Sequence, residues 1–399
     1  MKILVTGAKG FVGRNLVTAL EQIRNGNDKT RPLLKIEEIY EFDKDDDLEA
    51  LNRYCSDCDF IFNLAGVNRP KKESEFAEGN CLFLSDLLKM LEDQHNRCPV
   101  MLSSSIQASL SGRYKDSPYG KSKLEAEHLL KEYASRNEIR VLIYRFPNLF
   151  GKWCRPNYNS AVATFCYNYA HDLPIQVNDP NTELELVYID DLVNEMLDAL
   201  EGKEKRCEFD GTNAVKQDGG TYCYVSVSHK VTLGQIVDCL DRIKEQPKTL
   251  IVPELSDGSF IKKLYSTYLS YLPREKTIFD LSMHEDNRGS FTELVKTIDG
   301  GQFSVNVSKP GITKGQHFHH SKWEFFIVVK GKALIRERNI VTGEILELTV
   351  SDEKLQAVHM LQGYTHSISN LSNDSELITV MWANEIFDPG KPDTFHEEV

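Results

Sequence analysis

The sequence predicts an α/β Rossmann-type domain with a doubly wound parallel sheet, followed by an all-β jelly-roll domain. A strand, a glycine turn and a helix open the chain at residues 2–22. Strand-like and helical stretches then alternate, which is typical of a parallel sheet covered on both faces. After Pro273 short alternating runs replace this pattern, as in an antiparallel barrel. Because 399 residues exceed one ordinary domain, we expect domains at 1–272 and 273–399.

The elements of the first domain follow from its apolar periodicity. After the opening strand at residues 2–6 and helix at 14–22, the expected strands are 39–42, 60–64, 100–102, 141–144 and 184–188, and the expected helices are 77–91, 118–136 and 189–200.

The second domain shows period-two alternation between glycine and asparagine turns. The stretch 265–273 is the expected junction, and the expected strands include 290–296, 302–308, 324–329 and 376–382.

Composition excludes several function classes. The formal net charge of −13 argues against nucleic-acid or anionic membrane surfaces as partners. We find no apolar run of the roughly 18 residues that a membrane span needs, and no secretory leader. Nine scattered cysteines indicate reduced thiols rather than a disulfide framework. A cytoplasmic protein is therefore expected.

The glycine cluster after the first strand predicts a dinucleotide site. Gly7 permits a tight turn, Gly10 lets the backbone approach a pyrophosphate, and Gly13 lets the helix pack on the strand. The helix N-terminus then faces the phosphate charge.

Tyr119 and Lys123 form the second signal. Ser117 suits the N-cap and Pro118 the first position of a helix, so Tyr119 and Lys123 share one face. A nearby ammonium stabilises a phenolate and so fits a phenol for proton transfer. An isolated pair of this kind would be an ordinary surface contact. Here it follows the glycine turn and a strand ending at residues 103–105, which favours catalysis.

These motifs resemble the extended short-chain dehydrogenases/reductases, together with Asn63-Leu-Ala-Gly66, Arg145-Phe-Pro-Asn148-Leu-Phe-Gly151 and Tyr188-Ile-Asp-Asp191. The resemblance implies that Tyr119 donates the proton, that Lys123 tunes it and holds the nicotinamide ribose, and that Ser105 binds the reacting oxygen, with Ser104 as the alternative. The implied cofactor residues are Gly7, Gly10, Phe11, Val12, Gly13, Asp43, Lys44, Leu64, Ala65, Gly66, Asn80, Ser103, Tyr119, Lys123 and Phe146, and the expected substrate residues are Ser104, Ser105, Asn148 and Lys314.

The residues at the end of the second strand indicate whether NAD or NADP binds. An acidic residue there accepts from the ribose 2′-hydroxyl of NAD, whereas a cation favours the 2′-phosphate of NADP. The chain offers Asp43 and Lys44 side by side, so the residues alone leave both cofactors open.

Four side chains of the second domain predict a metal site. His317 and His319 lie two residues apart, so they share one face of a strand. Glu324 and His366 can join them from neighbouring strands. Three imidazoles and one carboxylate suit zinc or another divalent transition metal.

This region resembles the cupin superfamily through G-x₅-H-x-H-x₄-E-x₆-G at residues 311–331, and through Gly363, His366 and Asn370, although Leu361 replaces the usual proline. It also resembles cupin-class nucleotide-sugar 3- and 3,5-epimerases, in which the counterpart of His317 is a base. We favour His317 as a ligand, with His320 as a candidate base.

The whole chain resembles the bifunctional capsular-polysaccharide enzymes of the CapF type, for example at residues 64–70, 150–154, 264–273 and 384–389. The resemblance implies zinc-dependent C3 epimerisation of a UDP-2-acetamido-2,6-dideoxy-4-hexulose. NADPH-dependent reduction at C4 then gives UDP-2-acetamido-2,6-dideoxy-L-talose, on the route to UDP-N-acetyl-L-fucosamine for capsule or O-antigen. It also implies a homodimer. The alternatives are an NAD-dependent nucleotide-sugar 4-epimerase or dehydratase, and a non-enzymatic redox-sensing protein.

Overall fold

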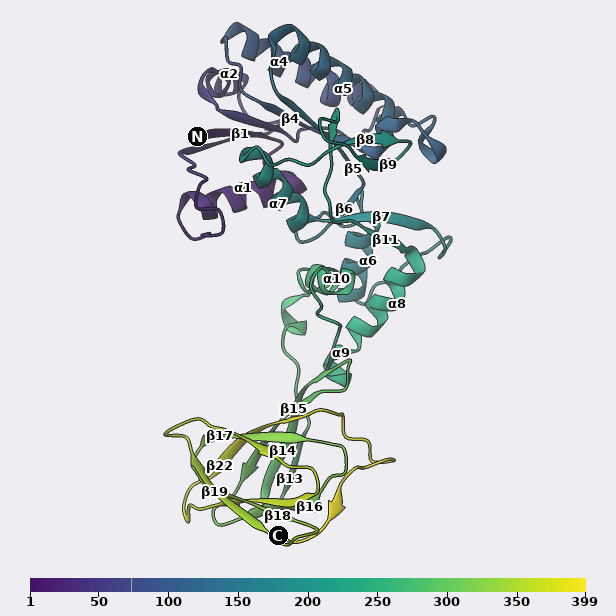
Figure 1. Cartoon of the computed structure of the whole chain (residues 1–399). Coiled ribbons are helices and arrows are strands. Elements are labelled where there is room, and N and C mark those ends of the chain that lie inside the picture. The colour runs from purple at the N-terminus through teal and green to yellow at the C-terminus, as the bar shows by residue number, and fades with distance from the viewer. Residues whose placement is uncertain (73) are drawn as a thin grey trace. The chain divides into compact units, whose positions relative to one another are not determined.

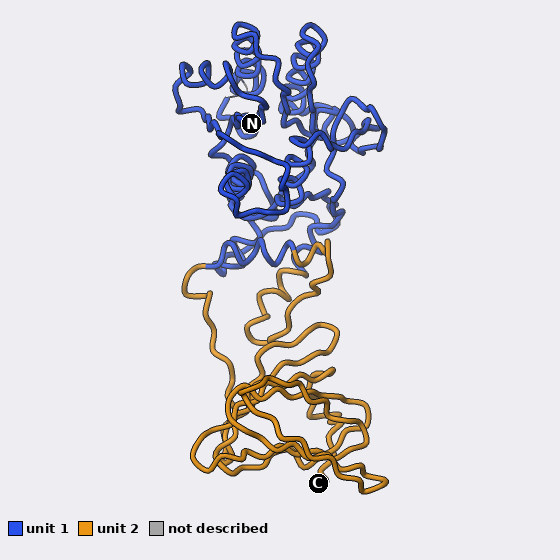
Figure 2. The backbone as a smooth tube through the Cα atoms, turned by 60° about the vertical axis from the view of Figure 1, so that its left-hand side comes forward, with its two compact units in different colours: residues 1–238, 263–272 blue, residues 239–262, 273–399 orange. Residues whose placement is uncertain are grey.

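The computed structural model describes residues 1–72 and 74–399 and divides into two compact units (Figure 2). The first comprises residues 1–238 and 263–272, and the second comprises residues 239–262 and 273–399. The expected boundary assigned residues 239–262 to the first domain. The structure groups them with the second because β12 (Ile251–Val252) pairs in parallel with β14 (Gly289–Thr297).

The main sheet of the first unit is parallel through five strands, in the order β2-β1-β3-β4-β5. The order reverses between β1 and β3, and in such sheets ligands bind outside the carboxyl ends of the strands at that reversal. Three further strands, β10, β8 and β9, extend the edge beyond β5. The bounds are β1 Lys2–Thr6, β2 Glu38–Phe42, β3 Phe60–Asn63, β4 Val100–Ser105, β5 Val141–Phe146, β8 Arg206–Asp210, β9 Asn213–Lys216 and β10 Tyr222–Cys223.

Helices cover both faces of this sheet (Figure 1), which confirms the doubly wound prediction. Alternate strand residues point to opposite faces, so Ile3 and Val5 join one buried cluster while Leu4 joins the other. The first cluster is closed by α1 (Phe11–Arg24) and α7 (Ile189–Leu200), and the second by α2 (Leu48–Asp57), α4 (Phe83–Asp93) and α5 (Pro118–Asn137).

Two local features differ from the expected elements. The strand expected at 184–188 is β7 (Glu183–Tyr188), but it lies in a separate sheet of order β11-β7-β6. The helix expected at 77–91 is interrupted by a π-helical turn, Glu78–Leu82, between α3 (Ser74–Ala77) and α4. Such turns frequently occur at functional sites, and this one carries Asn80. The other bounds are β6 Asn148–Phe150, β11 His229–Thr232, α6 Ala161–Ala170, α8 Leu233–Lys244, α9 Gln246–Thr249 and α10 Phe260–Leu269.

The second unit contains two sheets whose strands pair antiparallel, apart from the parallel contact of β12, which confirms the all-β prediction. One has the order β12-β14-β15-β22-β17-β20, with β13 also on β14, and the other has the order β19-β18-β21-β16-β23. The two sheets share a core, in which Phe326 and Val328 of one pack with Ile335 and Ile368 of the other. The bounds are β13 Met283–Asp286, β15 Gln302–Ser308, β16 Thr313–Phe318, β17 Glu324–Lys330, β18 Lys332–Asn339, β19 Ile345–Ser351, β20 Ala357–Met360, β21 Tyr364–Asn370, β22 Leu377–Ala383 and β23 Phe395–His396.

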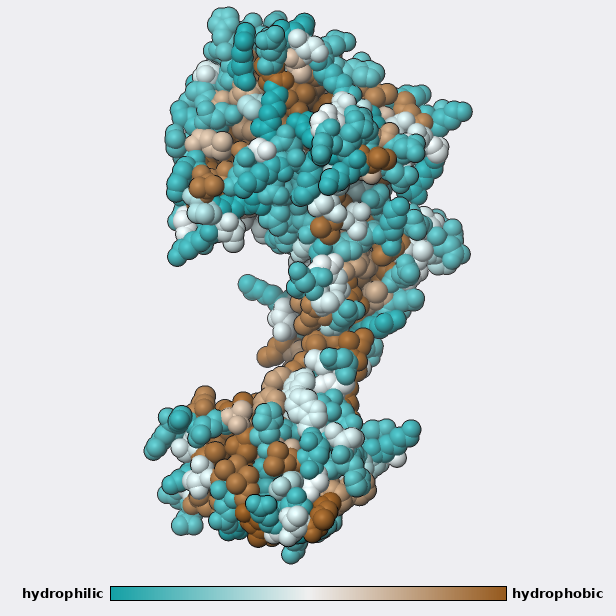
Figure 3. All heavy atoms as spheres, in the orientation of Figure 1, coloured by the Kyte–Doolittle hydropathy of each residue, from teal (hydrophilic) through white to brown (hydrophobic). Residues whose placement is uncertain are grey.

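The helices in the described part of the chain are too short or too polar to cross a lipid bilayer. Hydrophilic side chains cover most of the first unit on the face shown in Figure 3.

Candidate active sites

The glycine turn of the first unit is closed to larger side chains. Gly7 has a φ of +66°, and a Cβ on Gly13 would lie 2.2 Å from the carbonyl oxygen of Gly7. Gly10 is the N-cap of α1 and supplies no side-chain cap, so the first N–H groups of the helix keep their capacity to bind an anion. Phe11 and Val12 pack against the core beside this turn. The backbone here fits the pyrophosphate of a dinucleotide.

The loop after β3 brings a second part of the expected cofactor site to the same edge of the sheet. The loop begins with Leu64, Ala65 and Gly66, and a Cβ on Gly66 would lie 2.9 Å from Lys123 Nζ and 2.7 Å from Asn80 Oδ1. The Asn80 amide accepts from Val67 N and donates to Ser122 Oγ, both at 3.0 Å. Asn80 therefore ties this loop to α5.

Tyr119 and Lys123 lie in the first turns of α5, as expected. Ser117 Oγ accepts the N–H of Gly120 at 2.9 Å and Pro118 is the first helical residue, which confirms the predicted cap. Lys123 Nζ lies 5.8 Å from the centre of the Tyr119 ring and donates to the Ser103 carbonyl at 2.9 Å.

Burial sets the protonation of this pair. It raises the pKa of Tyr119 to about 12, so the phenol keeps its proton at neutral pH. Burial also lowers the pKa of Lys123 from 10.5 to about 8, against the opposing influence of Cys81 and Glu127. The sequence led us to expect Tyr119 as the proton donor, with its pKa tuned by the nearby ammonium of Lys123. The protonated phenol fits the donor role, and burial is the cause of its raised pKa.

The two serines at the end of β4 have different surroundings. Ser104 is 3% exposed, and its hydroxyl donates to Glu127 Oε1 at 2.6 Å. Arg145 binds the same carboxylate through two nitrogens. Ser105 is also buried, but among the described residues its Oγ accepts only the N–H of Gln107, at 3.2 Å. Because adjacent strand residues face opposite ways, Ser104 belongs to a buried polar network and Ser105 remains the better candidate for substrate.

Asp43, Phe146 and Asn148 were also expected at the site of the first unit, and the contacts described here join them to residues other than Tyr119 and Lys123. Both carboxylate oxygens of Asp43 accept backbone N–H groups, from Lys9 and from Lys44, each at 2.9 Å. Phe146 is a core residue, and the exposed Asn148 donates to the Glu185 carbonyl at 3.2 Å.

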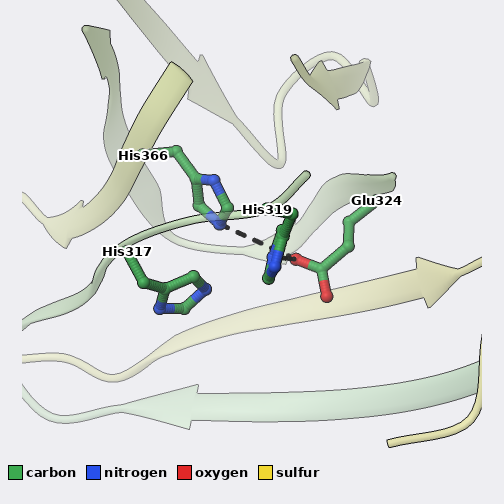
Figure 4. Close-up of side chains that lie close together, drawn as sticks. All are labelled: His317, His319, Glu324 and His366. Carbon is green, nitrogen blue, oxygen red and sulfur yellow. Dashed lines mark ion pairs between the residues drawn. The ribbon is translucent and has the colours of Figure 1, made fainter. Parts of the chain in front are cut away.

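The structure brings the four expected metal ligands together. His317, His319, Glu324 and His366 each offer one ligand atom, and these atoms lie within 4.8 Å of one another. Figure 4 shows His319 and His366 directed at the Glu324 carboxylate, with Nε2–Oε2 separations of 3.5 and 3.7 Å. Glu324 comes from β17, whereas His366 belongs to β21 of the opposite sheet.

A β-bulge turns His317 toward this cluster. The register of β16 against β21 skips Gln316, which has a φ of +63°. Lys314 pairs with Ile368 and His317 pairs with His366, so both face the inside of the unit. In a regular strand without the bulge at Gln316, residues two apart share a face, so His317 would point outward with Gly315.

The electrostatics of the cluster suit a cation. Burial lowers the pKa of His317 to about 4 and that of His366 to about 3, so both rings are neutral at pH 7. Burial alone would raise the pKa of Glu324, but the adjacent His319 ring and the charge of Lys322 lower it to about 2. In the described residues, His319 Nε2 and both ring nitrogens of His366 are buried without a hydrogen-bond partner. Neutral imidazoles, an ionised carboxylate and unsatisfied nitrogens fit a divalent metal.

Two residues at this centre were missed by the sequence reasoning. Lys322 Nζ binds Glu324 Oε1 at 2.7 Å and leaves the other oxygen to face the histidines. The Asp393 carboxylate accepts the backbone N–H groups of residues 320–322. Lys322 stands within the predicted motif, two residues before Glu324, but no pattern in the sequence marks Asp393.

Two other expectations concern residues near the cluster. His320 is exposed and packs edge-on against Phe318 and Phe395, outside the group of four ligands. Lys314 is half-buried and donates to Asn306 Oδ1 at 2.7 Å and to the Val307 carbonyl at 2.9 Å. The departure at Leu361 also has a structural role, because its N–H donates to Glu337 Oε2 at 2.9 Å, which a proline could not do.

Two family models match the chain, one over the region of the Tyr119–Lys123 pair and the other over the region of the histidine cluster. Residues 3–209 match the NAD dependent epimerase/dehydratase family, and residues 284–395 match the polysaccharide biosynthesis C-terminal domain. A crystal structure of the capsular polysaccharide assembling protein CapF from Staphylococcus aureus matches with a TM-score of 0.86 and 46% identity, over 100% of both chains. The chain belongs to the CapF family of capsular polysaccharide assembling proteins.

A second full-length relative carries the name of an enzyme. The UDP-2-acetamido-2,6-beta-L-arabino-hexul-4-ose reductase of Pseudomonas aeruginosa is 40% identical, over 99% of this chain and 98% of the relative. The UDP-glucuronic acid 4-epimerase of Bacillus cereus matches 68% of this chain with a TM-score of 0.51 and 21% identity, over 98% of its own length. That match supports the Rossmann-type fold alone.

Proposed function

We propose that this CapF-family chain is a bifunctional nucleotide-sugar enzyme. Its second unit would epimerise C3 of a UDP-2-acetamido-2,6-dideoxy-4-hexulose, and its first unit would reduce the C4 ketone. The product would be UDP-2-acetamido-2,6-dideoxy-L-talose for capsule synthesis. The observation that carries the proposal is the presence of two different reactive centres on one chain, the Tyr119–Lys123 pair and the four-ligand cluster. The full-length likeness to a hexulose reductase supports the substrate class.

In the reductase step, the nicotinamide would supply the two electrons and Tyr119 the proton. The Tyr119 hydroxyl holds its proton at neutral pH, so it can donate to the ketone oxygen as that oxygen gains negative charge. Lys123, fixed by the Ser103 carbonyl, would favour the resulting phenolate and bind the nicotinamide ribose. Ser105 would donate a hydrogen bond to the same ketone oxygen and position it against Tyr119.

In the epimerase step, a proton leaves C3 on one face and another returns on the opposite face. The ketone at C4 makes the C3 proton acidic, and a divalent metal, zinc by the family likeness, would stabilise negative charge on the ketone oxygen. His317, His319, Glu324 and His366 would hold that metal.

The cofactor is proposed to be NADPH. An acidic residue after the second strand would favour NAD, but both oxygens of Asp43 already accept backbone N–H groups. The adjacent Lys44 is a cation of the kind that accommodates a 2′-phosphate. We further propose a homodimer from the family likeness.

The decisive experiment supplies a UDP-4-keto-6-deoxy-HexNAc and NADPH in deuterated water. We expect deuterium at C3 of the product, from solvent exchange at the metal centre, together with stoichiometric loss of NADPH absorbance. Deuterium without NADPH oxidation would remove the reductase half, and oxidation without deuterium would remove the epimerase half. Purified protein that retains stoichiometric NAD and consumes no NADPH would instead favour a 4-epimerase.

A further inference from the structure

The two buried ligand histidines each have a second ring nitrogen that the metal would not use. The Nε2 atoms of His319 and His366 face Glu324 Oε2. A neutral imidazole that binds through Nε2 carries its proton on Nδ1, and this N–H needs an acceptor. The acceptors decide how firmly each ring is held. These acceptors matter because the proposed function places a metal at the cluster.

For His319 the acceptor is visible. Its Nδ1 contacts the main-chain carbonyl oxygen of Asp393. The Asp393 side chain accepts the N–H groups of His320, Ser321 and Lys322 at 2.7–2.8 Å. One residue of the C-terminal segment therefore fixes both the His319 ring and the loop that leads to Glu324.

For His366 the candidate acceptor is a carboxylate on the neighbouring strand. Glu337 of β18 is the register partner of His366, so the two side chains point to the same inner face. Both residues are 1% exposed. Within the described residues, Glu337 Oε1 and His366 Nδ1 are both buried without a hydrogen-bond partner. Directly opposed strand residues have Cβ atoms about 5 Å apart, so the unused His366 nitrogen and the unused Glu337 oxygen belong to neighbouring side chains.

We propose that Glu337 is the positioning residue of His366. The His366 Nδ1–H donates to Glu337 Oε1, directly or through one bound water, and this bond orients Nε2 toward the metal. Glu337 Oε2 is held by the Leu361 N–H, so the carboxylate has a fixed orientation. In this arrangement the Nδ1 atoms of His319 and His366 bind acceptors on the C-terminal segment and on β18, two segments that contribute no metal ligand.

The geometry makes glutamine an informative replacement. The Glu337 carboxylate can accept a hydrogen bond at each oxygen, whereas the Glu337→Gln amide accepts at one atom and donates at the other. The amide can satisfy the Leu361 N–H or the His366 N–H, but not both. The apoprotein should keep its stability, because there one Glu337 oxygen is unsatisfied in any case.

The test compares metal affinity with apoprotein stability. Zinc affinity of the full chain is measured by chelator competition, and the ligand geometry by the visible spectrum of the Co²⁺-loaded protein. We expect Glu337→Gln to weaken zinc binding about tenfold and to change the Co²⁺ spectrum, with an unchanged urea midpoint of the apoprotein. The matched control is Glu347→Gln on the adjacent β19, whose carboxylate pairs with Arg336 and is 54% exposed. It should behave as the wild type in every measurement.

Each other outcome has a definite meaning. If the wild type binds zinc and Glu337→Gln binds it equally well with the same Co²⁺ spectrum, the inference is wrong. A lower urea midpoint with an unaltered Co²⁺ spectrum would also overturn it, because Glu337 would then only stabilise the fold. If the wild type itself binds no metal, the proposed function fails first.

Discussion

The two candidate centres are assembled in different ways. The candidate reductase pair lies on one helix, where Tyr119 and Lys123 share a face that follows a capped first turn. The metal cluster draws its ligands from two sheets and depends on a bulge for the direction of His317. The helix centre is therefore determined by local geometry, and the strand centre by long-range pairing. If the two are independent, each can be removed without the other.

The largest expected effect comes from removing one centre at a time. Tyr119→Phe should lower the rate of ketone reduction by about a thousandfold or more, because the oxygen loses its proton donor. Zinc content and solvent exchange at C3 should stay as in the wild type. His319→Gln should do the reverse, with lost zinc and lost exchange but normal reduction of a substrate already epimerised at C3. Reduction by NADPH absorbance, exchange by NMR and metal by atomic absorption are measured on both variants.

One result would contradict the independence of the centres. If Tyr119→Phe also abolished exchange at C3, with zinc still bound, the two reactions would share a residue or an obligatory order. Reduction at the native rate in Tyr119→Phe would instead remove Tyr119 from the mechanism.

The same contrast explains what the sequence could predict. The cap at Ser117, the helix that follows and the pairing of Tyr119 with Lys123 follow from rules that span a few residues, and the structure has them where expected. The metal ligands could be named because their spacing is distinctive. The residues around them could not be named. Asp393 reaches His319 across 74 residues of chain, and Glu337 lies opposite His366 only because β18 pairs with β21. The bulge at Gln316 also has no clear signal in the sequence. The placement of β7 in a separate sheet depends on which strands it pairs with, and its own residues do not specify this.

A smaller effect separates the two serines at the end of β4. Ser105→Ala should lower kcat for reduction by ten- to a hundredfold, because the substrate oxygen loses one hydrogen bond, about 1.5–3 kcal/mol in the transition state. Ser104→Ala should change kcat less than about threefold. It should instead lower the free energy of unfolding by about 1–2 kcal/mol, since the buried Glu127 loses a donor. Steady-state kinetics and urea unfolding check both variants, and a larger loss of kcat in Ser104→Ala would exchange their roles.

Removal of the Lys123 ammonium should change stability and activity in opposite directions. Lys123 is 5% exposed, and burial lowers its pKa to about 8 from the ordinary 10.5. Below pH 8 both folded and unfolded chains hold the proton, so the folded state bears the full cost of the buried charge, about 3 kcal/mol. As pH rises from 8 to 10.5 the unfolded chain binds more protons than the folded one, and this cost disappears.

Lys123→Met should therefore stabilise the nucleotide-free protein at pH 7 while it abolishes reduction. The lost hydrogen bond to Ser103 offsets about 1 kcal/mol, so the expected net gain is about 2 kcal/mol. The gain should shrink steadily between pH 8 and 10.5, as measured by urea unfolding across that range. A matched substitution at Lys121, an exposed lysine on the same helix, should show no such pH dependence. If Lys123→Met were less stable than the wild type at pH 7, the buried ammonium would be stabilising the fold. Of the two centres, only the metal cluster would then contain a charged group that is buried at a cost to stability.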